Sequence, residues 1–251
     1  MTDLITRLNN RDIKVHISTF SKASLNRSDE RFQQKKILFS LDSTIITLTS
    51  KLLWKRGYDQ VKVFCGLNDW TSGVGGILIN FGHGNDNKYG NHTIDSIPEN
   101  GIGIMDRGFC SKIRISELIK KENQFFVLRI KNNINLKSLD NNKLLIGTGK
   151  KQVEVRLISF CDLDNKSEYR LVTNLKESEI NDDEIREIYR KRWGIETLWK
   201  FLKMPLKLDK LITKNENGIR IQIYSCDALS AVEVFNCLYF IAINRYTRRN
   251  R

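Results

Sequence analysis

A basic, aromatic stretch in the C-terminal third of the chain, YRKRWGIETLWKFLK, carries four side chains that could act together on phosphates. They are Tyr189, Arg192, Glu196 and Lys203. On an α-helix these positions fall within an arc of about 60° and extend over about 21 Å. Along such a stripe the carboxylate could bind a metal ion, while the Arg and Lys side chains bind neighbouring phosphates. A solvated helix face with an i,i+4 ion pair is the alternative interpretation.

Two further acids stand among apolar residues, where carboxylates are unfavourable. Asp42 lies within LFSLDSTII, and Asp106 ends the segment GIGIMD. Asp is depleted in strands, and a buried carboxylate requires a partner or a metal ion. A solvent-facing strand position for Asp42 and a turn position for Asp106, which precedes Arg107 and Gly108, remain as alternatives.

Asp42, Asp106 and Glu196 would form an oxygen-rich site if the two Asp residues lie on neighbouring strands and the helix crosses them. Mg²⁺ and Mn²⁺ favour carboxylate oxygens as ligands. Two such ions about 4 Å apart stabilise both the attacking and the leaving oxygen of an in-line phosphoryl displacement. We therefore predict that these three acids are metal ligands and catalytic residues for two ions, Mg²⁺ or Mn²⁺.

The elements around these residues predict an α/β fold with a mixed sheet flanked by helices. Three strands, a fourth strand, a helix and a fifth strand are expected in that order, at residues 35–50, 60–68, 75–84, 101–109, 111–123 and 124–131. Residues 132–180 contain short apolar segments between polar turns, so they predict a small β-rich insertion that lies beside the core.

One long helix is predicted to follow this insertion. Asn181, followed three residues later by Glu184, is a capping-box pattern, and Pro205 disfavours continuation of the helix. Trp193 and Trp199 lie off the charged stripe and are expected to pack in the core.

The chain is therefore predicted to have four parts. Residues 1–34 form a short basic N-terminal segment, and residues 35–131 together with 181–224 form the catalytic core. The β-rich insertion occupies residues 132–180, and residues 225–251 form a divergent C-terminal helix with a basic tail.

The charge of the chain favours a polyanionic partner. Lys and Arg total 42 against 29 acids, which gives a net charge of +13. Nucleic acid is the first candidate and an anionic membrane the second. No apolar run approaches the roughly 20 residues of a spanning helix, and no secretory signal is evident. We therefore expect no membrane partner. The five cysteines form no CxxC pair, so we expect a protein of the reducing cytoplasm.

The spacing Tyr-x2-Arg-x3-Glu-x6-Lys resembles the signature of the DDE transposases of bacterial insertion sequences, of the "insertion sequence four" type. SLDSTII and IMDRGF are similar to the regions of the first and second catalytic Asp of that family. YRLVTNL is similar to the strand before the signature helix. The match covers about residues 35–223.

The resemblance implies an RNase H-like core with a β-rich insertion before the last catalytic helix. It implies Mg²⁺-dependent hydrolysis at transposon ends and strand transfer into target DNA, with double-stranded DNA as partner, a homodimer on DNA, and a nucleoid-associated location in a bacterium. By motif match, Tyr189, Arg192 and Lys203 are expected to contact the transposon-end DNA.

Two features depart from the family pattern. Only about 35 residues precede the first predicted strand, and the C-terminal segment from residue 226 differs from the expected apolar helix. These departures are those of a truncated or frameshifted copy. A non-catalytic DNA-binding fragment that inhibits a full-length transposase, and a metal-dependent nuclease of the same fold, therefore remain as alternative functions.

Overall fold

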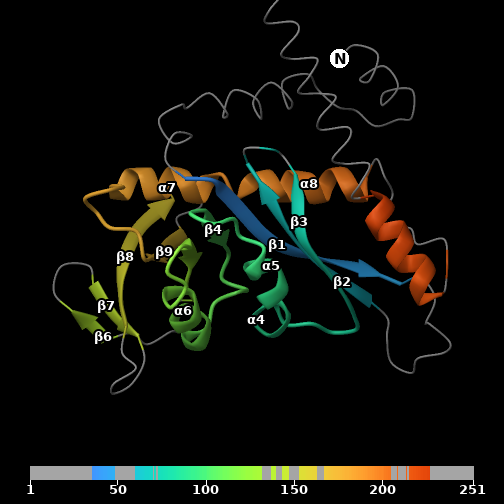
Figure 1. Cartoon of the computed structure of the whole chain (residues 1–251), viewed down its shortest axis with the longest axis horizontal. Helices are drawn as coiled ribbons and strands as arrows, with labels where there is room; N and C mark the ends of the chain where they lie inside the picture. The colour runs from blue at the N-terminus through green and yellow to red at the C-terminus, as the bar shows by residue number, and fades with distance from the viewer. Residues whose placement is uncertain are drawn as a thin grey trace, which may run out of the picture.

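A single mixed sheet runs through the part of the chain that the computed structural model describes. This part comprises residues 36–48, 60–69, 71, 73–131, 137–139, 143–146, 153–162, 167–204, 208, 213 and 215–226. Within it the sheet has nine strands in the order β3-β2-β1-β4-β5-β9-β8-β7-β6. Helices cover both faces of the sheet (Figure 1). The predicted segment 1–34 and residues 227–251 of the predicted C-terminal part lie outside the described residues.

The first five strands follow the predicted order. They are β1 (Leu38–Thr47), β2 (Gln60–Asn68), β3 (Val74–Phe81), β4 (Ile102–Met105) and β5 (Phe125–Arg129). The first three form an antiparallel meander, whereas β4 runs parallel to β1 and β5 runs parallel to β4. The connecting helices are α4 (Asp86–Tyr89), α5 (Asn91–Asp95) and α6 (Lys112–Ile119). The mixed α/β class is thus confirmed, while α4 and α5 were not predicted.

The stretch 132–180 is β-rich, but it does not pack separately. Its strands are β6 (Lys137–Leu139), β7 (Lys143–Ile146), β8 (Val153–Asp162) and β9 (Ser167–Thr173). Because β9 pairs antiparallel with β5, these strands continue the core sheet. Val155 and Val172 belong to the same apolar cluster as Leu41. The expectation of a body lying beside the core is therefore wrong, whereas the boundaries of the predicted parts stay a prediction.

The predicted long helix is two helices, α7 (Asp182–Arg190) and α8 (Trp193–Lys203), which follow one another across one face of the sheet (Figure 1). Between them the hydrogen bonds tighten to i→i−3, from Arg192 N to Tyr189 O and from Gly194 N to Lys191 O. Gly is a poor helix former, so its presence at this point favours the interruption. A further helix spans 216–226.

The two faces of the sheet have separate apolar cores. On one face, α5 and α6 pack against a cluster that includes Leu41, Phe64 and Phe126. On the other face, α7 covers a cluster around Ile104, and α8 covers a cluster around Val63. Polar residues of β1 therefore lie where the chain passes from α7 to α8.

The two Trp residues of α8 have different surroundings. Trp199 is buried against the sheet, as predicted. Trp193 is 60% exposed, so the prediction that it packs in the core is wrong. It is the first residue of α8, where the helix has only just begun to cover the sheet.

Two predictions from composition concern cysteines and membranes. In the part of the chain that the structure describes, Cys65, Cys110, Cys161 and Cys226 form no disulfide with one another. None of the helices in the described ranges has the length and apolar character needed to cross a bilayer.

Candidate active site

The pairing of β1 with β4 brings the two predicted Asp residues to the same level of the sheet. Leu41 pairs with Met105, so Asp42 and Asp106 are the next residues on adjacent parallel strands. Leu41 and Met105 are buried in the cluster beneath α5 and α6. Because side chains alternate along a strand, Asp42 is directed to the opposite face, which α7 and α8 cover. Asp106 follows the end of its strand at the same edge.

Electrostatics link Asp42 to the other two predicted acids. The pKa of Asp42 is raised from 3.8 to about 6, and burial is the largest cause. The backbone N–H of Ser43 opposes this rise in pKa. The nearby carboxylate of Asp106 raises the pKa further, Arg192 lowers it, and Glu196 adds a smaller rise. Carboxylates from β1, from the end of β4 and from α8 therefore influence one another.

Asp106 also has the turn role that its sequence context allowed. Its Oδ1 accepts a hydrogen bond of 2.7 Å from the backbone N–H of Gly108, and its carbonyl accepts one of 3.3 Å from Phe109 N. Because the turn uses one carboxylate oxygen, it fixes the orientation of the Asp106 side chain.

Glu196 forms an ion pair with Arg192, one helical turn before it. Arg192 donates to Glu196 Oε1 at 2.5 Å, and the two side chains are 14% and 28% exposed. The i,i+4 pair considered from the sequence is thus present, although it is partly buried. Through this pair Arg192 neutralises an acid cluster that would otherwise repel itself.

The donor set suits a hard divalent cation, because it consists of carboxylate oxygens on three elements. The carboxylates are not arranged as a ligand shell, however. Among the described residues, no group of three or more His, Cys, Asp or Glu side chains is close enough to hold a metal ion. Binding of a shared ion would require Glu196 to turn from Arg192 toward Asp42.

Tyr189, the first residue of the signature, is buried rather than displayed on the surface. It is 6% exposed, and its ring meets Tyr169 of β9 edge-to-face at a centroid distance of 6.2 Å. The guanidinium of Arg192 lies 5.7 Å from the ring centroid of Tyr189. Burial raises the pKa of the Tyr189 hydroxyl, and Arg192 opposes this rise. The ring of Tyr189 therefore packs against Arg192. The expected contact of Tyr189 with DNA stays a prediction.

Lys203, the last residue of the signature, contacts the strand that carries Asp42. Its Nζ donates to the carbonyl of Ile45 at 3.0 Å. The signature residues therefore extend across the sheet, from Tyr189 beside β9 to Lys203 beside β1.

The comparison with known proteins identifies the family. Residues 33–232 match the family described as "Transposase DDE domain". The chain belongs to this family. It is 53% identical over 249 residues to a protein of Synechocystis sp. named "Putative transposase for insertion sequence element IS4SA", with 90% of this chain and 73% of the relative covered.

Two more distant relatives are also transposases by name. "Putative transposase y4zB" of Sinorhizobium fredii is 26% identical, with 86% of this chain and 65% of the relative covered. "Probable transposase for insertion sequence element IS5377" of Geobacillus stearothermophilus is 23% identical, with 85% and 60% covered. The chain therefore spans about two thirds of the length of these transposases. The similarity to the relative named for IS4SA supports the predicted type.

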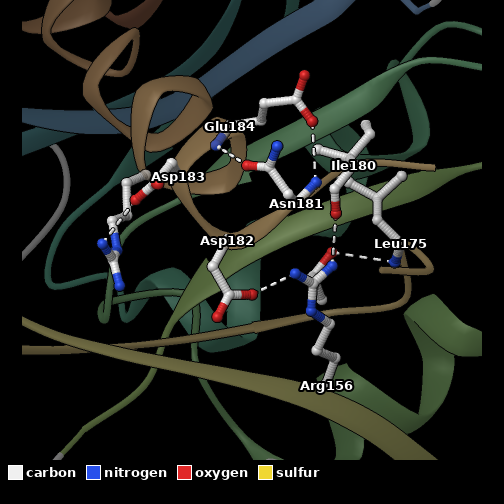
Figure 2. Close-up of polar contacts among 9 residues, drawn as sticks. Arg156, Leu175, Ile180, Asn181, Asp182, Asp183 and Glu184 are labelled. Atoms are coloured by element: carbon white, nitrogen blue, oxygen red, sulfur yellow. Dashed lines mark hydrogen bonds and ion pairs between the residues drawn. The ribbon is translucent and has the colours of Figure 1, made fainter. Parts of the chain in front are cut away.

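In this DDE-domain chain, the start of the signature helix pair is fixed by two sets of contacts (Figure 2). The predicted capping box is confirmed: Glu184 N donates to Asn181 Oδ1 at 2.9 Å, and Asn181 N donates to Glu184 Oε2 at 2.8 Å. Arg156 of β8 donates to the carbonyl of Ile180 at 2.7 Å and pairs with Asp182. A strand of the predicted insertion therefore anchors α7.

Sequence reasoning missed a second polar group beside the site. Asp86, the first residue of α4, accepts a hydrogen bond from Ser43 and forms an ion pair with Lys62. The sequence offered only a weak signal, an isolated Asp after GHGN, because its partners lie 43 and 24 residues away.

Proposed function

We propose that this chain is the catalytic part of a DDE transposase, which hydrolyses DNA at transposon ends and joins those ends to target DNA. The observation that carries the proposal is the pairing of Leu41 with Met105, which brings Asp42 and Asp106 to adjacent positions on neighbouring strands. The influence of Glu196 on Asp42 and the match to the DDE-domain family support it. An antiparallel meander followed by parallel strands with connecting helices supports an RNase H-like core.

In this proposal Asp42, Asp106 and Glu196 hold two Mg²⁺ or Mn²⁺ ions. When bound, such ions supply activation of the attacking oxygen and stabilisation of the leaving oxygen. Asp106 is held in place by Gly108 N. Arg192 balances the acids until metal and DNA arrive, and then contacts a phosphate as a bidentate donor.

The partner in this proposal is double-stranded DNA, bound by a homodimer at the transposon ends in the bacterial cytoplasm. The net charge of +13 supports a polyanionic partner. Arg192 and Lys203 flank Glu196 along the helix pair, and this order supports phosphate contacts on both sides of the cleaved bond. In this proposal the ring of Tyr189 packs against Arg192, and the hydroxyl of Tyr189 contacts the DNA.

The test is cleavage of supercoiled plasmid, with and without Mg²⁺ or Mn²⁺, followed by joining of labelled transposon ends. Asp42→Asn, Asp106→Asn and Glu196→Gln should each abolish cleavage and keep DNA affinity. Asp95→Asn is the matched control, because this carboxylate is 66% exposed and pairs with Lys121.

Three outcomes separate the candidate functions. Metal-dependent cleavage with end joining supports the transposase. Cleavage without joining favours a nuclease, and DNA binding without cleavage by the unmodified chain favours an inhibitory fragment. The ion pair of Glu196 with Arg192 is the observation that favours this last alternative, since it occupies one of the required acids.

A further inference from the structure

The strand that carries Asp42 has a second polar site on its other face. Asp86 Oδ1 accepts a hydrogen bond of 2.5 Å from Ser43 Oγ and lies 2.7 Å from Lys62 Nζ. Lys62 Nζ also donates to the carbonyl of Gly84 at 2.9 Å. This triad, Ser43–Asp86–Lys62, therefore connects β1, β2 and the start of α4.

The triad is largely withdrawn from solvent. The side chains of Lys62 and Asp86 are 10% and 19% exposed. A buried ion pair contributes little net stability, because the cost of desolvating two charges offsets their attraction. What it supplies instead is a defined geometry, since both charges are satisfied only when the two elements keep one spacing.

The second oxygen of Asp86 lies against the turn that holds Asp106. A Cβ atom placed on Gly108 would come within 2.6 Å of Asp86 Oδ2 and 2.9 Å of Asp106 Oδ1. Gly108 therefore allows a close approach that any side chain would prevent. The same residue donates its N–H to Asp106 Oδ1 at 2.7 Å.

Asp86 thus lies against a neighbour of each predicted Asp ligand, Ser43 beside Asp42 and Gly108 beside Asp106. Through Ser43 it fixes the residue next to Asp42, and through Gly108 it packs on the turn that orients Asp106. Ser43 follows Asp42 in the strand, so its side chain is directed to the opposite face. One oxygen of Asp86 is taken by Ser43 and Lys62, which argues against a role as a fourth metal ligand.

We propose that Asp86, held by Lys62, is a positioning residue that sets the separation of Asp42 and Asp106 for divalent-cation binding. This inference rests on the proposed function, because it assumes that these two acids bind the metal. Groups that orient metal ligands from behind typically change metal affinity by about 10- to 100-fold when they are removed.

The experiment is a titration of the full chain with Mn²⁺ in the absence of DNA. Electron paramagnetic resonance measures the concentration of free Mn²⁺ at each step. Asp86→Ala should weaken Mn²⁺ binding about 10-fold or more. Affinity for duplex DNA in the absence of metal should stay unchanged. Asp95→Ala, which removes an exposed carboxylate from α5, is the control and should bind Mn²⁺ as the unmodified chain does.

A second variant separates positioning from loss of folding. Ser43→Ala removes the hydroxyl and keeps the Asp86–Lys62 pair, so it should fold normally and still weaken Mn²⁺ binding. If Ser43 acts through Asp86, the double variant Ser43→Ala/Asp86→Ala should bind Mn²⁺ no more weakly than Asp86→Ala alone.

The outcomes distinguish this inference from the proposed function. Unchanged Mn²⁺ affinity in Ser43→Ala and in folded Asp86→Ala, together with a clear loss in Asp42→Asn, would overturn the positioning role and leave the metal site standing. Unchanged affinity in Asp42→Asn as well would overturn the metal site, and the positioning role would fall with it.

Discussion

Asp42 is the residue at which stability and proposed chemistry oppose each other. Its pKa is raised from 3.8 to about 6 by burial and by neighbouring acids, so the folded chain binds this proton more tightly than the unfolded chain does. The free energy of unfolding should therefore fall as pH rises from about 4 through 6. The full cost corresponds to about 3 kcal/mol above that range. A bound divalent cation would relieve it.

The first prediction follows from this sign. Asp42→Asn should be more stable than the unmodified chain at pH 7.5 without metal, by about 1–3 kcal/mol. The two should converge below about pH 3, where Asp42 is protonated in both the folded and the unfolded state. Urea unfolding at several pH values measures the difference, with Asp95→Asn as the exposed control. A pH-independent difference would contradict the assigned pKa.

The second prediction separates the roles of Glu196 and Lys203. Glu196→Gln should keep DNA affinity and lose cleavage, because an amide is a poor substitute for a carboxylate ligand of Mg²⁺. Lys203→Ala should weaken DNA binding and reduce the slope of log affinity against log salt by about one unit. Binding at two salt concentrations and a separate cleavage assay test both. Equal, small losses would indicate an ordinary charged helix face.

The sequence was most informative where spacing and chemistry coincide. Asp42 and Asp106 stand out because carboxylates among apolar residues are costly, and Glu196 because it is the single carboxylate on a basic, aromatic helix stripe. Asp106 and Glu196 both influence the pKa of Asp42, while the catalytic roles of the three acids stay a prediction. Asp86 and Lys62 were not selected, because each is unremarkable within its own segment. Their partnership arises only when β2 and the start of α4 come together, which local sequence does not encode.

At the scale of elements, the helix pair shows which features are local. The capping box at Asn181 was predictable because its two hydrogen bonds join residues three apart. The interruption before α8 was missed because the charged positions keep a helical spacing from 189 through 203, although Gly194 was a signal for it. The anchoring of α7 by Arg156 was also unpredictable, since Arg156 and Asp182 are brought together by the sheet.

The third prediction concerns this anchor. Arg156→Ala should destabilise the fold by about 1–3 kcal/mol, because it leaves the Ile180 carbonyl without this donor in a partly buried site. Arg190→Ala is the matched control and should change stability by roughly 0.5 kcal/mol or less, since Arg190 is 68% exposed and pairs only with Glu187 among the contacts that the described residues make. Thermal or urea unfolding measures both. Equal losses of stability in the two variants would show that the ion pair of Arg156 with Asp182 contributes no more than an exposed surface pair.

At the scale of the whole molecule, the decisive contact is the antiparallel pairing of β5 with β9. β5 buries Phe126 and Leu128 on one face and Val127 on the other, so it suits the interior of a sheet rather than an edge. β9 pairs with that edge of β5, and β8 pairs with the other edge of β9. A separate insertion looked reasonable from sequence because the pairing register joins residues more than 40 apart. Short apolar segments and polar turns in the sequence predict that strands form, but they do not predict which strand each one pairs with.

The last prediction is that the described sheet unfolds as one unit. Val155, Val172, Leu41 and Phe126 share one apolar cluster, and Arg156 links β8 to the signature helices. Backbone amides of β8 and β9 should therefore exchange hydrogen with the same free energy of opening as those of β1 and β4. Hydrogen exchange followed by mass spectrometry, over a series of low urea concentrations, measures these values strand by strand. Residues 216–226 serve as an internal comparison, because this helix packs on the α8 side of the sheet and is expected to open more readily. If β8 and β9 opened at a distinctly lower free energy while β1 and β4 stayed protected, they would form a separate cooperative unit, and the original prediction of an independent insertion would be restored.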